Sequence, residues 1–243
     1  MLELKNISFV AENEEGNKEI LKNINLKVEE GFTVITGPNG GGKSTLAKII
    51  AGINTATSGE IWLGEENITD LSITERARKG ISFAFQQPVR FKGITVHDLI
   101  CLAAGKEVDI ATACEYLSQV GLCARDYINR EVNAYLSGGE LKRIEIATVL
   151  ARGTEISIFD EPEAGIDLWS FNSLIKVFEK MREMLGGSII IISHQERILN
   201  IADRIIVVKD GEIHKTGTRD EILPELLGKA DSTCRVLAEK AGV

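Results

Sequence analysis

Long apolar stretches are missing from this sequence of 243 residues. A run such as Ile189–Ile192 is far shorter than the roughly 20 apolar residues that a membrane-spanning helix needs. The opening residues, Met1-Leu-Glu-Leu-Lys, carry no signal-peptide pattern. We therefore expect a cytoplasmic protein with no direct membrane insertion, so that any role at a membrane would come through another chain.

Basic residues and paired cysteines are also scarce. The chain has 28 Lys and Arg against 36 Asp and Glu, which gives a formal net charge of −8. Because phosphate backbones are bound by clustered Lys and Arg, we expect no nucleic-acid partner. No two cysteines form a C-x-x-C pair and no histidine stands at zinc-ligand spacing from them, so we expect thiols in a reducing compartment. These cysteines are Cys101, Cys114, Cys123 and Cys234.

Hydrophobic residues make up 44% of the chain, enough to bury a core without disulfides or metal. The first 35 residues have the apolar alternation of β-strands, with an acidic hairpin loop expected over Ala11–Lys18. Residues 88–136 are helical in character and form an expected helical lobe. From residue 156 to residue 208 strands and helices alternate, which predicts a parallel sheet with helices on both faces. The end, Thr218–Val243, is expected to be an amphipathic helix.

The individual elements are predicted from the apolar periodicity and from Gly-containing turns. Helices are expected from Lys43 and over 99–104, 110–120, 171–185 and 196–202, and strands over 33–36, 59–63, 81–85, 156–159, 188–193 and 204–208, with a tight hairpin at Asp210-Gly211.

A glycine-rich segment after the strand 33–36 matches the pattern G-x-x-x-x-G-K-[ST]. Its glycines allow consecutive backbone N–H groups to surround a β-phosphate, and the start of the following helix adds a positive dipole. Lys43 would bridge the β- and γ-phosphates, and the Ser44 hydroxyl would ligate magnesium. A surface loop without a ligand is the alternative. The expected nucleotide-binding residues are Gly37, Asn39, Gly40, Gly41, Gly42, Lys43, Ser44 and Thr45.

A pair of carboxylates ends the apolar strand Ile156–Phe159. In proteins with such a phosphate loop, this strand end lies beside the loop. Asp160 would then hold the Mg²⁺ shell through water, and Glu161 would polarise the attacking water as a general base. Ordinary surface acids at the end of a buried strand are the alternative.

The stretch Leu136-Ser-Gly-Gly-Glu140 opens a helix whose apolar face includes Leu141, Ile144 and Ala147. Such a helix start is fit to meet phosphate oxygens, although a capped helix without a ligand is also consistent with it. Together with the phosphate loop, this stretch resembles the signature of ATP-binding-cassette (ABC) ATPases. The resemblance covers nearly the whole chain.

Further stretches agree with that family in order along the chain. Phe85-Gln86 resembles the Q-loop, Asp160-Glu161 the Walker B pair, Ala164-Gly-Ile-Asp167 the D-loop, and Ile192-Ser-His194 the switch histidine. The resemblance implies catalytic roles for Glu161, His194 and Gln86, and magnesium ligation through Ser44, Gln86 and Asp160. It also implies that Ser137, Gly138, Gly139 and Asp167 contact the nucleotide.

The family also implies a fold and an assembly. The fold is a single α/β domain over residues 1–243, a P-loop NTPase core with a mixed, mainly parallel sheet and an N-terminal antiparallel β-subdomain. Residues 1–87 and 137–243 would form the catalytic core and residues 88–136 the inserted helical subdomain. Two copies would pack head to tail when ATP binds, so that Ser137 and Gly139 of one copy complete the site around Lys43 of the other.

One departure from the family concerns the binding of adenine. Many family members stack adenine on an aromatic residue in the first β-hairpin, whereas this chain offers Phe9, Val10 and Ala11 and has no Tyr before Tyr116. We expect weak stacking, or stacking on Phe9.

Within the family, two stretches resemble SufC, the iron–sulfur cluster assembly ATPases: Phe83-Ala-Phe-Gln-Gln-Pro-Val89 and His194-Gln-Glu-Arg-Ile-Leu199. That resemblance implies a SufB/SufD-type scaffold as the partner. The leading Leu136 and the Leu-Trp-Ser after Asp167 depart from the commonest SufC form, so a transporter ATPase bound to membrane subunits is the alternative. A non-catalytic binding module is a third class, disfavoured because Glu161, Ser137 and His194 are all present.

Overall fold

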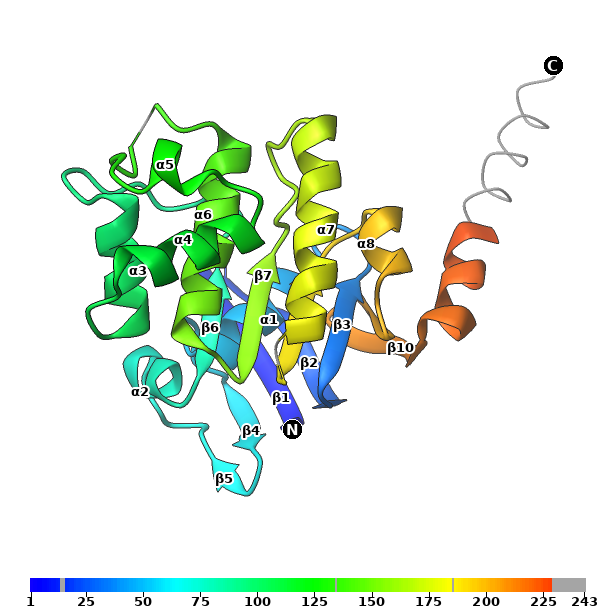
Figure 1. Cartoon of the computed structure of the whole chain (residues 1–243). Helices are drawn as coiled ribbons and strands as arrows, with labels where there is room; N and C mark the ends of the chain where they lie inside the picture. Colours follow the sequence, from blue (N-terminus) through cyan, green and yellow to red (C-terminus); the bar gives the residue numbers. More distant parts are fainter. Residues whose placement is uncertain (14–15, 134, 185, 229–243) are drawn as a thin grey trace, which may run out of the picture.

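A parallel sheet forms the centre of the computed structural model, which describes residues 1–13, 16–133, 135–184 and 186–228 (Figure 1). Its strand order is β10-β9-β3-β8-β7-β6, and only the edge strand β10 runs antiparallel to its neighbour. The carboxyl ends of the other strands therefore meet at one edge of the sheet. The strands are β3 (Gly31–Thr36), β6 (Ile81–Ala84), β7 (Ile156–Asp160), β8 (Ser188–Ile192), β9 (Arg204–Lys209) and β10 (Glu212–Thr218).

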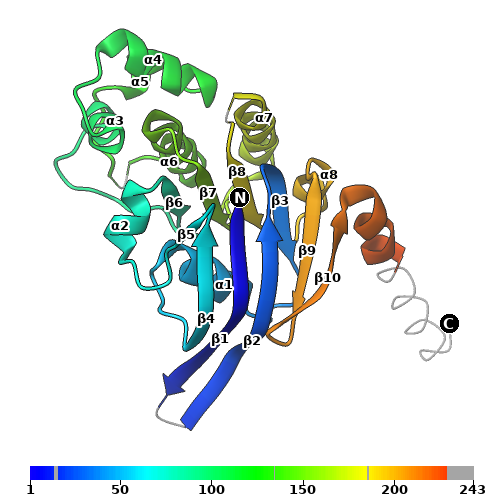
Figure 2. The ribbon, with the colours of Figure 1, turned by 90° about the horizontal axis from the view of Figure 1, so that it is seen from below.

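A second, antiparallel sheet has the order β2-β1-β4-β5. Figure 2 shows β4, β1 and β2 side by side, with α1 behind them. Helix α1 lies between the two sheets, and its residues Leu46, Ile49 and Ile50 are buried in a core with side chains from both. The bounds are β1 (Leu2–Asn13), β2 (Gly16–Val28), β4 (Ser58–Leu63), β5 (Glu66–Asn67) and α1 (Lys43–Ala51).

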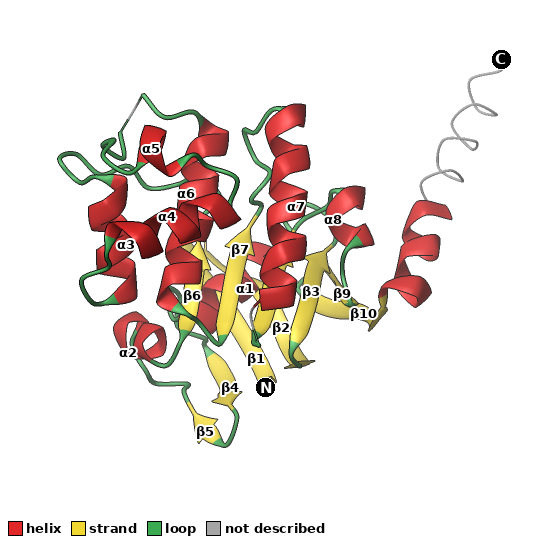
Figure 3. Cartoon of the chain, in the orientation of Figure 1, coloured by secondary structure: helices red, strands yellow, loops and turns green. Residues whose placement is uncertain are grey.

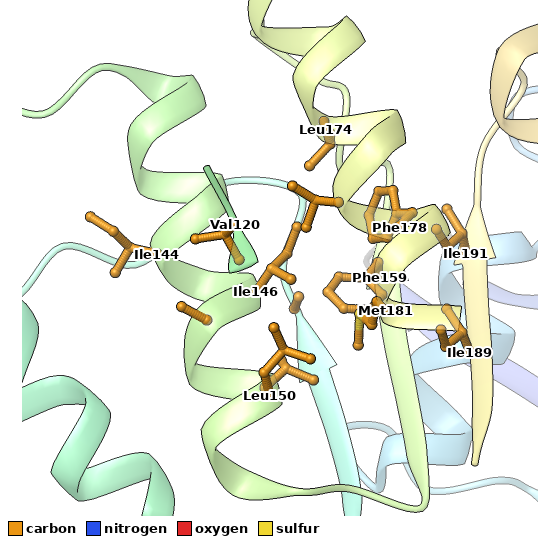
Figure 4. Packing of buried hydrophobic residues seen from close by; sticks show 14 of the residues in the cluster. Val120, Ile144, Ile146, Leu150, Phe159, Leu174, Phe178, Met181, Ile189 and Ile191 are labelled. Carbon is orange, nitrogen blue, oxygen red and sulfur yellow. The ribbon is translucent and has the colours of Figure 1, made fainter. Parts of the chain in front are cut away.

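Other helices cover the opposite face of the central sheet. Alternate residues of its strands point to this face, where Phe159 and Ile191 meet Phe178 and Ile146 (Figure 4). The edge-to-face contact between Phe159 and Phe178, with ring centroids 5.2 Å apart, lies within this layer. The covering helices are α6 (Gly138–Arg152), α7 (Leu168–Met184) and α8 (Glu196–Asn200).

A group of helices without strands of its own packs on α6 (Figure 3). It contains α3 (Val96–Ala104), α4 (Ile110–Gln119) and α5 (Ala124–Tyr127). An isolated bridge between Thr95 and Glu131 ties its two ends together. The α/β fold with a mixed, mainly parallel sheet and an antiparallel β-subdomain is thus as the sequence predicts.

One local prediction is wrong and one helix was missed. The predicted loop Ala11–Lys18 is mostly strand, because β1 and β2 stay paired through Ala11↔Lys18 to Asn13↔Gly16. The polar residues Asn17 and Lys18 are exposed on this paired ribbon, so they do not mark a break in pairing. Helix α2 (Ile73–Arg78) was not predicted, although the capping box of Ser72 and Glu75 could have indicated it. For the predicted helix Thr218–Val243, residues 219–228 are helical and residues 229–243 lie outside the described residues.

Within the part of the chain that the structure describes, no helix is long and apolar enough to cross a membrane. Cys101, Cys114 and Cys123 are free thiols, and Cys123 is exposed. Cys234 lies outside the described residues.

Helix α2 contributes the buried Arg76, whose guanidinium joins three segments. It donates hydrogen bonds to the Ile49 and Ile50 carbonyls at the end of α1 (2.6 and 3.0 Å), to the Thr69 carbonyl (2.7 Å) and to the Leu71 carbonyl (3.1 Å). The last carbonyls of a helix have no partner within the helix, so a buried helix end needs an outside donor. Arg76 fixes the end of the helix that carries Lys43 at its start.

We expect Arg76→Met to lower the free energy of unfolding by about 3 kcal/mol, because buried carbonyls lose a charged donor. Urea unfolding of the purified variant measures this. Arg78→Met is the matched control, because Arg78 lies in the same helix and is exposed. Equal unfolding midpoints for the two variants would contradict the assignment.

Candidate functional site

The loop between β3 and α1 is rich in glycine, and two of its glycines lie close to β9 and β2. Gly37 has φ 136°, and a Cβ there would lie 2.0 Å from the Val208 carbonyl oxygen of β9. Gly42 has φ 100°, and its Cβ would lie 2.6 Å from the Leu21 side chain of β2. At Gly37 both the positive φ and the nearby backbone require glycine, and at Gly42 the positive φ favours it. The loop is therefore fixed against both sheets.

Gly42 is also the N-cap of α1, so no side chain accepts a hydrogen bond from the first turn. Helices α2, α3 and α6 begin differently, with complete capping boxes at Ser72, Thr95 and Ser137. The first turn of α1 contains no acidic residue either. This helix start presents N–H groups and a positive dipole to an anion.

Lys43 is buried, and its ammonium group donates to the carbonyls of Gly37 (2.8 Å) and Pro38 (2.9 Å). Burial lowers the pKa of Lys43, while the nearby Glu161 and Asp160 raise it. The side chain thus curls back along the loop and holds a positive charge beside the N–H groups.

Ser44 donates its hydroxyl hydrogen bond to Oδ1 of Asp160, at 2.8 Å. Asp160 is the last residue of the buried strand β7, and its burial raises the pKa of the carboxyl group against the opposing effect of Ser44. This contact brings together the loop and the strand end, 116 residues apart in the sequence. A hydroxyl and a carboxylate are oxygen ligands of the kind that Mg²⁺ binds.

Glu161 adopts a left-handed backbone conformation with φ 43°. Its N–H donates to the Ile192 carbonyl of β8 at 3.0 Å, and its carboxylate accepts a 2.6 Å hydrogen bond from Nε2 of Gln86. A non-glycine residue with positive φ is strained, and such strain concentrates at functional sites. The turn aims Glu161 away from the sheet and toward the loop after β6.

Lys43, Ser44 and Glu161 line one cavity of ≈ 480 Å³, and Asp160 is joined to it through Ser44. Its lining joins the phosphate loop, two residues of β2, and the Gln86–Glu161 pair: Lys18, Ile20, Asn39, Gly40, Gly42, Lys43, Ser44, Thr45, Gln86 and Glu161. The uncapped helix start, the cationic Lys43 and the oxygen ligands fit a polyphosphate with its Mg²⁺. Among the described residues no group of three or more His, Cys, Asp or Glu could hold a metal. The ion would therefore depend on few protein ligands, completed by phosphates and water, as is usual for Mg²⁺.

Among the residues that the structure describes, no aromatic side chain lines this cavity. Ile20 and Lys18 of β2 stand there instead, while Phe9 packs against the core between the sheets. The prediction of weak adenine stacking remains a prediction. Ile20 is an apolar side chain in the lining of this cavity.

The signature residues form the start of α6. Ser137 is its N-cap: Oγ accepts from the Glu140 N–H at 3.3 Å, and the Glu140 carboxylate accepts from the Ser137 N–H at 2.7 Å. A Cβ at Gly138 would lie 3.2 Å from the Gly165 carbonyl oxygen, so the signature packs closely on the D-loop. None of Ser137, Gly138 and Gly139 lines the cavity at Lys43.

Of the other predicted residues, Gly37, Gly41, Asp160, Asp167 and His194 do not line the cavity either. Asp167 caps α7, because its Oδ1 accepts from the N–H groups of Trp169 and Ser170, each at 3.0 Å, and these hydrogen bonds lower the pKa of its carboxyl group. His194 follows β8 and is exposed, with a 3.5 Å contact between its Nε2 and the Gln195 amide.

The sequence reasoning missed Glu163. Its Oε1 accepts the hydroxyl hydrogen bond of Ser193, and burial raises the pKa of its carboxyl group. Its Oε2 is buried without a hydrogen-bond partner among the described residues. Nothing local distinguishes this acid, because its partner lies 30 residues away.

Residues 21–164 match the ABC transporter family. The chain is 41% identical over 216 residues to an uncharacterized ABC transporter ATP-binding protein of Methanocaldococcus jannaschii, covering 85% of this chain and 86% of that protein. It is 35% identical to the probable ATP-dependent transporter ycf16 of Cyanophora paradoxa, covering 89% and 88%. A dimeric, post-hydrolysis structure of the ATP-binding cassette MJ0796 bound to ADP and Pi superimposes with a TM-score of 0.79 at 29% identity, covering 90% of this chain and 99% of that one.

We expect the buried charge of Asp160 to lower the free energy of unfolding of the native protein. Asp160→Asn keeps the acceptor for Ser44 and removes a buried charge, so we expect a higher unfolding midpoint than the native protein at neutral pH without nucleotide. Because the folded pKa of Asp160 is raised, the native carboxyl takes up a proton as the pH falls through that pKa, and the advantage of the variant shrinks. Urea unfolding from about pH 4, near the ordinary pKa of an aspartate, to about pH 8 measures the difference.

Asp126→Asn is the control, because Asp126 is exposed. A pH-independent difference between Asp160→Asn and the native protein would contradict the electrostatic cause.

Proposed function

This chain belongs to the ABC transporter family, and we propose that its ATP hydrolysis drives a conformational change in a SufB/SufD-type scaffold of iron–sulfur cluster assembly. As an ABC ATPase, the chain binds and hydrolyses ATP. The observation that supports the site assignment is the single cavity in which the phosphate loop, Gln86 and Glu161 meet. The partner and the residue roles are proposals.

The phosphate loop would bind the substrate's phosphates. The N–H groups from Gly40 to Thr45 surround the β-phosphate, and Lys43 exchanges its contacts with the Gly37 and Pro38 carbonyls for the β- and γ-phosphates. Ser44 would hold Mg²⁺ directly and Asp160 would hold it through water. When bound, the ion neutralises charge that develops on the phosphates.

Glu161 would act as the general base on the attacking water. Gln86 donates to its carboxylate at 2.6 Å, which holds that carboxylate at the mouth of the cavity. Gln86 would also reach the Mg²⁺ shell once the nucleotide is present. His194 would contact the γ-phosphate, and its exposure leaves it free to turn toward that group.

A second copy would complete the site. Ser137 lies outside the cavity at Lys43, so one chain alone does not enclose the γ-phosphate. The Ser137 oxygen accepts within its capping box, which leaves the hydroxyl hydrogen available for a phosphate oxygen. Exposed apolar side chains flank this helix start: Tyr135 is 93% exposed, Leu168 60% and Trp169 80%. Such a group of exposed apolar residues indicates a contact surface.

We expect Glu161→Gln to form a stable dimer with Mg-ATP and to lose turnover, because the amide keeps the shape of the side chain but cannot accept the proton. Size-exclusion chromatography measures the dimer. Trp62→Phe leaves Trp169 as the only tryptophan, and its emission should shift to shorter wavelength as the dimer excludes water. Lys43→Ala added to Glu161→Gln should remain monomeric. Hydrolysis by Glu161→Gln at the native rate would count against the assigned base.

The partner would dock in an apolar groove of ≈ 320 Å³ between the central sheet and residues 88–136, which we propose as the helical subdomain. The stretch that resembles SufC supplies part of its wall, namely Phe83, Phe85, Pro88 and Val89, and Phe91 follows. Arg90 and Lys92 beside it are exposed. The position of this stretch is what supports a cluster-assembly scaffold as the partner.

The alternative is the ATP-binding subunit of a membrane transporter, with membrane subunits docked in the same groove. The names of the two similar proteins favour it, since both describe transporters. Either reading uses the same ATPase site, so the partner alone separates them.

Affinity purification of the native protein from its own cells, with identification of the co-purifying chains, tests the partner. We expect a soluble β-helical scaffold, whose recovery Phe91→Glu should reduce by about tenfold, as expected for a charge placed in an apolar contact. Ile110→Glu is the control, because Ile110 is exposed on α4 and lies outside the groove. A multi-span membrane protein as the specific partner would instead establish the transporter reading.

A further inference from the structure

A buried ion pair on α6 stands outside the phosphate site. The side chains of Lys142 and Glu145 are only 2% and 18% exposed, and their charged groups are 3.1 Å apart. Burial raises the pKa of Glu145, opposed by the charge of Lys142. A buried ion pair is weak grounds for stability, because apolar residues of similar volume often replace one without loss. Its presence suggests a positional role.

The pair binds both polar groups of one peptide segment. Lys142 Nζ donates to the Phe85 carbonyl oxygen, and the Phe85 N–H donates to Glu145 Oε1 at 3.2 Å. Phe85 follows the last residue of β6, and β6 is the edge strand of the central sheet. The sheet therefore gives Phe85 no strand partner, and the two α6 side chains take that place.

Phe85 connects three functional parts of the molecule. The next residue is Gln86, whose amide donates to Glu161. The Phe85 ring lines the apolar groove and contacts Phe83 edge to face, with centroids 4.9 Å apart. Lys142 and Glu145 lie on the helix that begins at the signature residue Ser137. A rigid contact at Phe85 thus links the signature helix, the groove and Gln86.

We propose that Lys142 and Glu145 are positioning residues for ATP hydrolysis, which set the place of Gln86 by binding both backbone groups of Phe85. This inference rests on the role proposed for Gln86. Neither Lys142 nor Glu145 lines the cavity at Lys43, although the charge of Lys142 lowers the pKa of Asp160. Through Phe85, the Lys142–Glu145 pair makes the position of Gln86 relative to Glu161 depend on the position of α6. It also makes that position depend on any molecule bound in the groove.

The test replaces the pair by Lys142→Met/Glu145→Met, which keeps side-chain length and helix propensity and removes both contacts to Phe85. We expect kcat for ATP to fall by about tenfold or more at nearly unchanged KM, because the phosphate loop is untouched. Lys142→Gln/Glu145→Gln should restore most of kcat, since an amide can donate to the carbonyl and accept from the N–H. The surface pair Lys79–Glu66, changed in the same way to methionine, is the control and should keep the native kcat.

Gln86→Ala separates a positioning role from a merely structural one. If the pair acts through Gln86, adding Lys142→Met/Glu145→Met to Gln86→Ala should lower kcat no further, whereas independent effects would multiply. A folded methionine variant with native kcat, or multiplicative losses, would overturn the inference and leave the proposed ATPase site intact. A native kcat for Gln86→Ala itself would instead contradict the proposed site.

Should the methionine pair fail to fold, Lys142→Met/Glu145→Gln replaces it in the same comparison, because it keeps the contact to the Phe85 N–H. We expect its kcat to lie below that of the glutamine pair. Equal kcat values for these two variants would overturn the inference.

Discussion

The close approach of the phosphate loop to the end of β9 is the constraint on which the site depends. A Cβ at Gly37 would lie 2.0 Å from the Val208 carbonyl oxygen, so the chain passes there only as bare backbone. That passage sets the start of α1, and with it Lys43 and Ser44, at the carboxyl edge of the sheet. Because β7 is parallel to β8 and β3 in the same sheet, its last residue Asp160 lies beside Ser44. The site is therefore a consequence of sheet topology combined with one glycine-rich loop.

Motifs that depend on local geometry could be predicted from the sequence. The glycine spacing before Lys43, the apolar strand before Asp160 and the alternation of strands and helices each specify a local structure, and the mixed sheet follows from their order. The boundaries of β1 and β2 could not be predicted, because polar residues on an exposed ribbon resemble a loop. Glu163 could not be found either, since its surroundings come from Ser193, which is distant in the sequence. Long-range contacts of this kind carry no signal in spacing.

The roles of Ser137 and Asp167 illustrate a further limit. Both are helix caps in the single chain, and capping alone accounts for their residue types. A cap and a phosphate ligand use different atoms of a serine, however, since the oxygen accepts from the helix while the hydrogen remains available. The single-chain structure is therefore compatible with the capped-helix explanation and with the composite site at once. Only a second copy with nucleotide distinguishes them.

The backbone N–H and C=O of Phe85, just beyond the end of β6, connect the nucleotide site with the groove. An edge strand that ends early needs other partners for its next peptide, and here a buried ion pair on α6 supplies them. An apolar pair would fill the same volume, but it would leave Phe85 free to move relative to the helix. Since Phe85 also lines the groove, any partner that fills the groove contacts the same residue that α6 binds. The sequence neighbour of that residue, Gln86, donates to Glu161, so a partner docked in the groove would contact the residue next to Gln86.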